Sequence, residues 1–127
     1  MVSFSVGEPD FVTPQYIRTA AHEALDMGLT KYTPAAGTLG LRRAICEKLR
    51  RDNGLEYSPS QVIVSNGAKF SIYASLAAIV NPGDEVLIPT PCWVSYPEIV
   101  RIVGGVPVLV QGDAKKGFVT EAEDLAP

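Results

Sequence analysis

The chain has 127 residues, of which 46% are hydrophobic and 20% charged, and its net charge at pH 7 is -3. This composition is typical of a globular chain of about one domain. Because acidic residues slightly outnumber basic ones, the charge gives no reason to expect binding to nucleic acid or to an acidic membrane. The sequence contains no apolar run long enough to cross a bilayer and no signal peptide, and its two cysteines lack the spacing of metal ligands. We therefore expect a cytoplasmic protein without a metal site.

The N-terminal part of the chain predicts a short strand followed by a helix. Val2 to Val6 is apolar, and the turn residues after it end that strand. Pro14 after Thr13 is a typical helix start, with Thr13 as the capping residue, and Gly28 ends the helix. His22, the only histidine, lies beside the apolar face of this helix and is expected on the surface.

A second helix is predicted from apolar residues that recur every four positions. Leu41, Ile45 and Leu49 would share one face, and Asn53-Gly54 would end the helix. Cys46 is expected to pack on this helix. Four arginines at helical spacing predict a solvated face rather than a nucleic-acid site, and they are Arg42, Arg43, Arg50 and Arg51.

The remainder of the chain alternates between strand and helix signals. After a turn at Ser58-Pro59-Ser60, the expected elements are a buried strand from Val62, a helix from Gly67 to Val80, a strand from Glu85 to Ile88, a helix from Tyr96 and a strand from Val106 to Val110. This order is typical of an α/β fold with a largely parallel sheet.

The end of the chain suggests that this sheet is incomplete. Thr120 to Glu123 has the spacing of a capping box and would open a helix that Pro127 interrupts. Buried parallel strands also need neighbouring strands and two covered faces. We therefore expect a truncated part of a larger domain, cut at both ends.

The junction at Gly67-Ala68-Lys69 is the strongest candidate for a binding site. The first turn of a helix leaves backbone N-H groups without intrahelical partners, and the helix dipole places partial positive charge there. An anionic group such as phosphate fits such a junction, and Lys69 adds a full charge beside it.

Five motifs resemble, in order and spacing, the class I/II aminotransferases of fold type I, which use pyridoxal 5'-phosphate. The motifs are Gly7-Glu8-Pro9-Asp10-Phe11, Lys31-Tyr32-Thr33-Pro34-Ala35-Ala36-Gly37, Asn66-Gly67-Ala68-Lys69, Pro82-Gly83-Asp84-Glu85-Val86 and Pro91-Cys92-Trp93-Val94-Ser95-Tyr96-Pro97. Bacterial aspartate aminotransferases are the most similar group. The resemblance extends over essentially the whole chain but corresponds only to the N-terminal portion of the family's enzyme.

The resemblance implies roles for individual residues. Gly67, Ala68 and Lys69 match the turn that holds the cofactor phosphate, and Trp93 matches the aromatic residue that stacks on the pyridine ring and borders the substrate. Tyr32 matches a tyrosine that reaches the cofactor phosphate of the partner subunit, which implies a homodimer with shared active sites. Gly7 matches a glycine whose backbone lies beside the substrate carboxylate.

Each of these residues also has a structural interpretation when it is considered alone. Gly67 would be a turn glycine, Trp93 a core or rim aromatic, Tyr32 a loop tyrosine and Gly7 a strand terminator. Their common place in five motifs in register favours binding. Cys92, next to Trp93, is expected near the pocket without a chemical role.

No lysine of this chain matches the one that forms the Schiff base in the family. Of the five lysines, only Lys69 lies near the predicted phosphate site, and a lysine there is too close to the phosphate end to reach the aldehyde carbon. In the family the Schiff-base lysine, the aspartate that pairs with the pyridine nitrogen and the arginine that binds the α-carboxylate all lie downstream. We expect no catalytic residue in this chain, and no transamination by the chain alone.

The resemblance thus implies part of the three-layer α/β/α, mostly parallel sheet of the large domain. Residues 1–13 would be the N-terminal segment or arm of the small domain, and residues 14–127 the incomplete cofactor-binding domain. The intact protein would transfer an amino group between an amino acid, with aspartate or glutamate favoured, and a 2-oxo acid. Two alternatives remain open: a lyase or synthase of the same fold, and an aminotransferase-like sensor domain of a transcription regulator. For the chain itself, a scaffold that binds no ligand also remains open.

Overall fold

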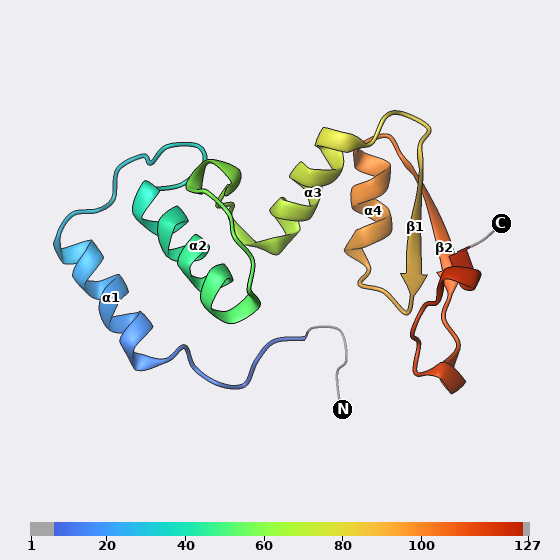
Figure 1. Ribbon diagram of the computed structural model, residues 1–127, viewed down its shortest axis with the longest axis horizontal. Helices are drawn as coiled ribbons and strands as arrows, with labels where there is room; N and C mark the ends of the chain where they lie inside the picture. Colours follow the sequence, from blue (N-terminus) through green and yellow to red (C-terminus); the bar gives the residue numbers. More distant parts are fainter. Residues whose placement is uncertain (1–6, 126–127) are drawn as a thin grey trace, which may run out of the picture.

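The computed structural model describes residues 7–125 (Figure 1). Four α-helices and two strands follow one another as α1 (Gln15–Asp26), α2 (Leu39–Asn53), α3 (Gly67–Ile79), β1 (Glu85–Thr90), α4 (Ser95–Ile102) and β2 (Val106–Gln111). Short 3-10 helices span Pro59–Gln61, Ala114–Lys116 and Ala122–Leu125. The strand predicted at Val2 to Val6 lies outside the described residues.

The unit β1-α4-β2 confirms the predicted α/β arrangement. The two strands pair in parallel, with Glu85 opposite Val106 and Thr90 opposite Gln111. Helix α4 connects them and packs on both, and α3 packs against α4. The buried hydrophobic side chains of the described region come from β1 and α4, and they are Ile88, Ile99 and Val100. This small core holds β1 and α4 together, and with them the loop between the two elements.

The sheet leaves large apolar side chains in solvent. Leu109 of β2 is 60% exposed, and Leu87 of β1 also points away from the core. Parallel strands usually have both faces covered, because their side chains are apolar on both sides. In residues 7–125 the sheet therefore supplies only part of the three-layer arrangement that the resemblance implies.

The prediction of a buried strand from Val62 is wrong for this structure. Val62 is extended, at φ -114° and ψ 127°, but the described sheet consists of β1 and β2 alone, and Ile63 is 76% exposed. Apart from a local bond from Val62 N to Pro59 O, the segment makes one backbone hydrogen bond to the loop between α1 and α2, from Val64 N to Ala36 O at 3.1 Å. A strand requires a ladder of such bonds with a partner, and local sequence does not specify that partner.

Two of the predicted helix starts also differ from the structure. Pro14, and not Thr13, is the N-cap of α1, because the Pro14 carbonyl accepts hydrogen bonds from Ile17 N and Arg18 N and no side chain caps the helix. Near the other end, the backbone N-H of Glu121 donates to the Asp124 carboxylate at 2.9 Å, and the element there is a short 3-10 helix. The capping box predicted for Thr120 to Glu123 is therefore not the arrangement that forms.

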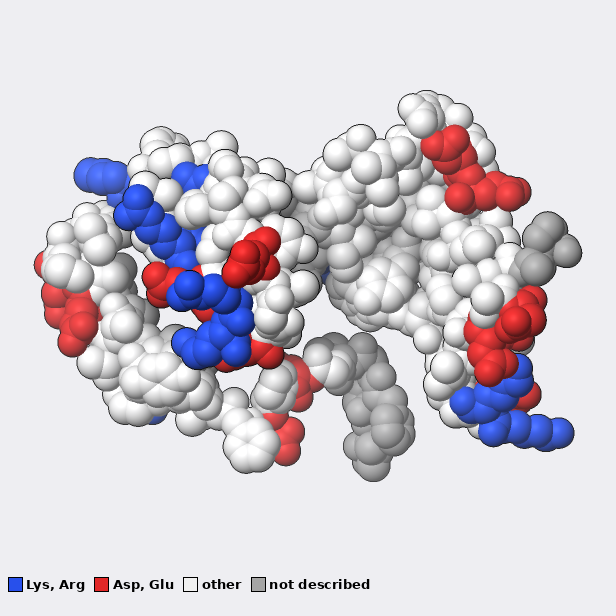
Figure 2. Space-filling model, viewed as in Figure 1, with Lys and Arg blue, Asp and Glu red and all other residues white. Residues whose placement is uncertain are grey.

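The C-terminal end of α2 was predicted from the sequence, but one of its arginines was misassigned. Gly54 ends the helix at a φ of +66°, as Asn53-Gly54 predicted. Arg42 does not belong to a solvated face, because it is half-buried and its Nη1 donates to Pro59 O at 2.9 Å. Figure 2 shows acidic and basic side chains interspersed on this part of the visible face, and this charge pattern agrees with the absence of a basic run in the sequence.

Candidate functional site

The N-terminal turn of α3 begins at Gly67, as predicted, and offers free backbone donors. Gly67 adopts a φ of +78°, and its own N-H donates to Ser65 O at 2.9 Å. Among the described residues, the N-H groups of Ala68 and Lys69 donate no hydrogen bond to a backbone carbonyl. These two donors, together with the positive end of the helix dipole, make the turn suitable for an anion.

A pair of serine hydroxyls borders this turn and was not singled out from the sequence. The Oγ atoms of Ser65 and Ser71 lie 2.5 Å apart, and Ser71 Oγ also donates to Gly67 O at 3.3 Å. The spacing in the sequence could have indicated this pair. Ser65 comes two residues before Gly67, and Ser71 comes four residues after it, which is about one helical turn. Hydroxyls in this position can donate to an oxyanion that binds at the turn.

Trp93 lies in the loop between β1 and α4, after the cis peptide bond between Thr90 and Pro91. Its side chain is 42% exposed, and the ammonium Nζ of Lys69 lies 4.7 Å from the centre of its ring. The ring of Tyr96, on the first turn of α4, meets Trp93 edge to face with ring centres 5.6 Å apart. The structure therefore brings the predicted phosphate turn and the predicted stacking residue together, with Lys69 between them.

Tyr32 lies in the loop between α1 and α2, and its ring is fully exposed. It lines a pocket of about 410 Å³ that is also lined by Ser65 and Asn66, which directly precede α3. The loop is held against the segment before α3 at Gly37, where a methyl group would come within 2.8 Å of Val64 Cβ. Tyr32 and the two residues that precede the phosphate turn thus line one cavity.

Gly7 is the predicted site residue that the structure does not bring to the others. A Cβ atom built on Gly7 meets open space within 4 Å. Its predicted role beside a substrate carboxylate therefore gains no support from a neighbouring group among the described residues.

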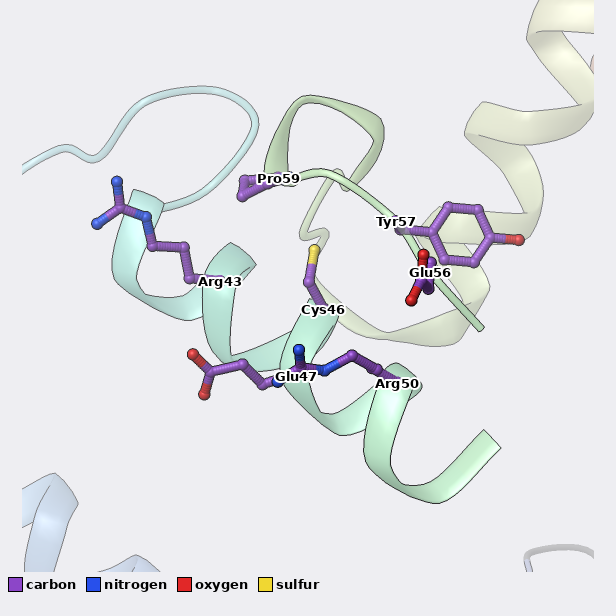
Figure 3. A pocket seen from close by; sticks show the side chains of 7 residues that line it. All are labelled: Arg43, Cys46, Glu47, Arg50, Glu56, Tyr57 and Pro59. Carbon is purple, nitrogen blue, oxygen red and sulfur yellow. The ribbon is translucent and has the colours of Figure 1, made fainter. Parts of the chain in front are cut away.

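A second pocket, of about 440 Å³, lies between α2 and the chain that follows it (Figure 3). Two arginines and two glutamates line it, so their charges cancel, and it contains none of the predicted site residues. Cys46 also lines it and is half-buried. His22 is exposed, as expected, and Cys92 is half-buried beside Trp93.

The described residues contain neither a metal-binding cluster nor a helix that could span a membrane. Within residues 7–125, no cluster of three or more His, Cys, Asp and Glu side chains has the arrangement of a metal site. The helices of the same region are too short or too polar for any of them to cross a membrane.

Comparison with known proteins gives one family for the whole chain. The sequence profile of the family "Aminotransferase class I and II" matches residues 1–127. The aspartate/prephenate aminotransferase of Cereibacter sphaeroides is 50% identical over 125 residues, which is 98% of this chain and 31% of that protein. The chain therefore spans about a third of the length of this relative.

Solved structures agree with the sequence match. The aspartate aminotransferase from Rhizobium meliloti superposes with a TM-score of 0.91 at 48% identity, over 95% of this chain and 30% of that one. An aromatic aminotransferase from Pyrococcus horikoshii OT3 superposes with a TM-score of 0.90 at 46% identity, over 94% of this chain and 32% of that one. The chain has the α/β fold of the matching part of these proteins, and it belongs to the class I and II aminotransferase family.

Proposed function

We propose that this chain supplies the phosphate-binding and ring-stacking part of a pyridoxal 5'-phosphate site in an aminotransferase. The observation that supports the proposal most strongly is the contact between Lys69 and Trp93, because it joins an anion-binding helix turn to a flat aromatic surface. A phosphate on a flat heteroaromatic ring requires these two features side by side. The residues present therefore fit this cofactor.

The proposed roles follow from the groups that each residue offers. The backbone N-H groups of Ala68 and Lys69 would bind phosphate oxygens, and Gly67 would allow the chain to enter the helix at a positive φ. Trp93 would fix the tilt of the cofactor ring. In a homodimer, the Tyr32 hydroxyl would donate a hydrogen bond to the phosphate of the cofactor in the partner subunit. Gly7 would border the substrate carboxylate.

When bound, pyridoxal 5'-phosphate acts as an electron sink that makes the α-carbon of an amino acid acidic. This chain's own contribution is to hold and orient that group. We propose aspartate or glutamate as the amino donor and a 2-oxo acid as acceptor, since the Rhizobium meliloti and Cereibacter sphaeroides proteins carry aspartate in their names. The division at residue 13 into an arm and a cofactor-binding domain is part of the same proposal.

Equilibrium dialysis with 4'-deoxypyridoxine phosphate tests the binding role. This analogue retains the ring and the phosphate but has no aldehyde, so surface lysines cannot capture it. We expect saturable binding at one site, a large loss of affinity for the analogue without phosphate, and a loss of about 2–10-fold in Trp93→Ala that Trp93→Phe restores.

The matched control is Tyr57→Ala, which alters an exposed aromatic residue at the pocket on α2. This control variant should bind as the unmodified chain does. Equal affinity for the analogues with and without phosphate would refute the proposal.

A further inference from the structure

The side chain and the backbone of Lys69 belong to different halves of the site. Lys69 is the third residue of α3, so its N-H is one of the free donors at the turn. Its ammonium lies 4.7 Å from the centre of the Trp93 ring, within the range of a cation-π contact. One residue therefore takes part in both the anion turn and the stacking surface.

Trp93 is held from two directions in this arrangement. The Lys69 ammonium lies over the ring, and Tyr96 meets it at an interplanar angle of 84°. Tyr96 also donates its backbone N-H to Trp93 O at 3.0 Å, which joins the loop to the start of α4. Of the Lys69 and Tyr96 contacts, a ligand can replace that of Lys69, because its ammonium is at the end of a flexible side chain on another element.

Among the described residues, no carboxylate lies within 4.0 Å of the Lys69 ammonium. The ion pairs of residues 7–125 use other lysines and arginines, and none includes Lys69. An ammonium ion binds a phosphate oxygen through a charge-assisted hydrogen bond, which is stronger than an exposed cation-π contact. An anion at the turn would therefore draw the ammonium away from the ring.

We propose that Lys69 is a positioning residue that couples the two halves of the site. Without an anion its ammonium covers Trp93 and holds the ring in place, and a phosphate bound at the turn draws the ammonium off and frees the ring face for stacking. Because the coupling needs an anion at the turn, it rests on the proposed function. It adds an order of events, in which phosphate capture precedes ring stacking.

The single tryptophan allows a direct test by NMR, because the chain gives only one indole N-H signal. Inorganic phosphate is added to the ¹⁵N-labelled chain, with sodium chloride at equal ionic strength as the reference. The amide signals of Ala68 and Lys69 report anion binding, and the indole signal of Trp93 reports the ring. In the unmodified chain we expect both sets of signals to shift along one saturation curve.

Three variants separate coupling from a merely structural role. In Lys69→Met the indole signal should already be displaced without phosphate, and it should not respond when phosphate shifts the Ala68 amide. Lys69→Arg should restore the indole response, because a guanidinium binds both the ring and phosphate. Lys115→Met, on the exposed turn Ala114–Lys116, should behave as the unmodified chain does.

The amide and indole signals distinguish the two proposals. Amide shifts at Ala68 and Lys69 without an indole shift would overturn the coupling and leave the proposed phosphate site standing. The absence of any amide shift at saturating phosphate would overturn both. An indole signal that is identical in Lys69→Met and the unmodified chain would overturn the coupling alone, since Lys69 would then not lie over the ring.

Discussion

Gly37 lies directly against Val64, and this contact sets the position of the Tyr32 loop beside the start of α3. A methyl group on Gly37 would approach Val64 Cβ to 2.8 Å, and the backbone there has a φ of +89°. The neighbouring carbonyl of Ala36 accepts the Val64 N-H at 3.1 Å. The loop that carries Tyr32 is therefore joined to the segment that leads into the phosphate turn.

Gly37→Ala should lower the free energy of unfolding by about 1–3 kcal/mol, because it combines an unfavourable φ with a steric clash. The measurement is urea unfolding followed by circular dichroism. Gly54→Ala is the matched control: its φ is +66° but its Cβ position is open, so only the backbone cost of about 1 kcal/mol applies. Equal losses in the two variants would contradict the proposed contact.

Thr38 caps α2, whereas Thr13 does not cap α1. The Thr38 hydroxyl accepts the Leu41 N-H at 3.4 Å. Because this bond is long, Thr38→Ala should cost only about 0.5–1 kcal/mol of unfolding free energy, the lower part of the range for N-caps. Thr13→Ala should leave stability unchanged in the same urea experiment, and a larger loss for Thr13→Ala than for Thr38→Ala would show that the helix begins one residue earlier.

These two threonines show what the local sequence can predict about a helix start and what it cannot. The pair Thr13-Pro14 carries a strong start signal, but Pro14 itself provides the first helical carbonyl, so Thr13 falls outside the helix. The elements β1, α4 and β2 were predictable because breakers such as Pro82-Gly83 bound apolar runs. The strand from Val62 was not predictable, because its existence depends on a pairing partner rather than on its own residues.

The candidate site was also only partly predictable. The turn at Gly67 follows from local chemistry, since glycine before an apolar helical run indicates a helix start. The contact between Lys69 and Trp93 joins residues on different elements, and only the packing of α3 against α4 brings them together. The hydroxyl pair of Ser65 and Ser71 was not predicted for a similar reason, because only the geometry of the turn brings the two Oγ atoms together.

Asp84 should make stability depend on pH. Its carboxylate accepts the Asn81 backbone N-H at 2.7 Å and the Asn81 side-chain amide at 3.0 Å, and these bonds, the backbone one foremost, lower the pKa of Asp84. A lowered folded-state pKa means that the stabilisation is fully present above the unfolded pKa of about 4. It is lost as pH falls from there through the folded pKa.

Urea unfolding at a series of pH values between 2 and 7 measures this dependence. Asp84→Asn should flatten the part of the curve below about pH 4. A curve for Asp84→Asn that matches the unmodified chain throughout would contradict the role of these hydrogen bonds.

The chain alone should not transfer amino groups. With aspartate, 2-oxoglutarate and pyridoxal 5'-phosphate, oxaloacetate should form no faster than with the cofactor in the absence of protein, because no lysine here matches the family's Schiff-base lysine. A coupled malate dehydrogenase assay measures this rate. Turnover above the protein-free rate that disappears in Lys69→Arg would make Lys69 catalytic and would contradict its proposed role as a positioning residue.

The most direct test of the phosphate and ring site is an NMR titration of the ¹⁵N-labelled chain with 4'-deoxypyridoxine phosphate. We predict that the amide signals of Ala68 and Lys69 and the indole signal of Trp93 shift together and saturate at one equivalent. If these three signals stay unchanged while the amide signals of Arg43 and Arg50, at the pocket on α2, shift instead, the proposed site is contradicted.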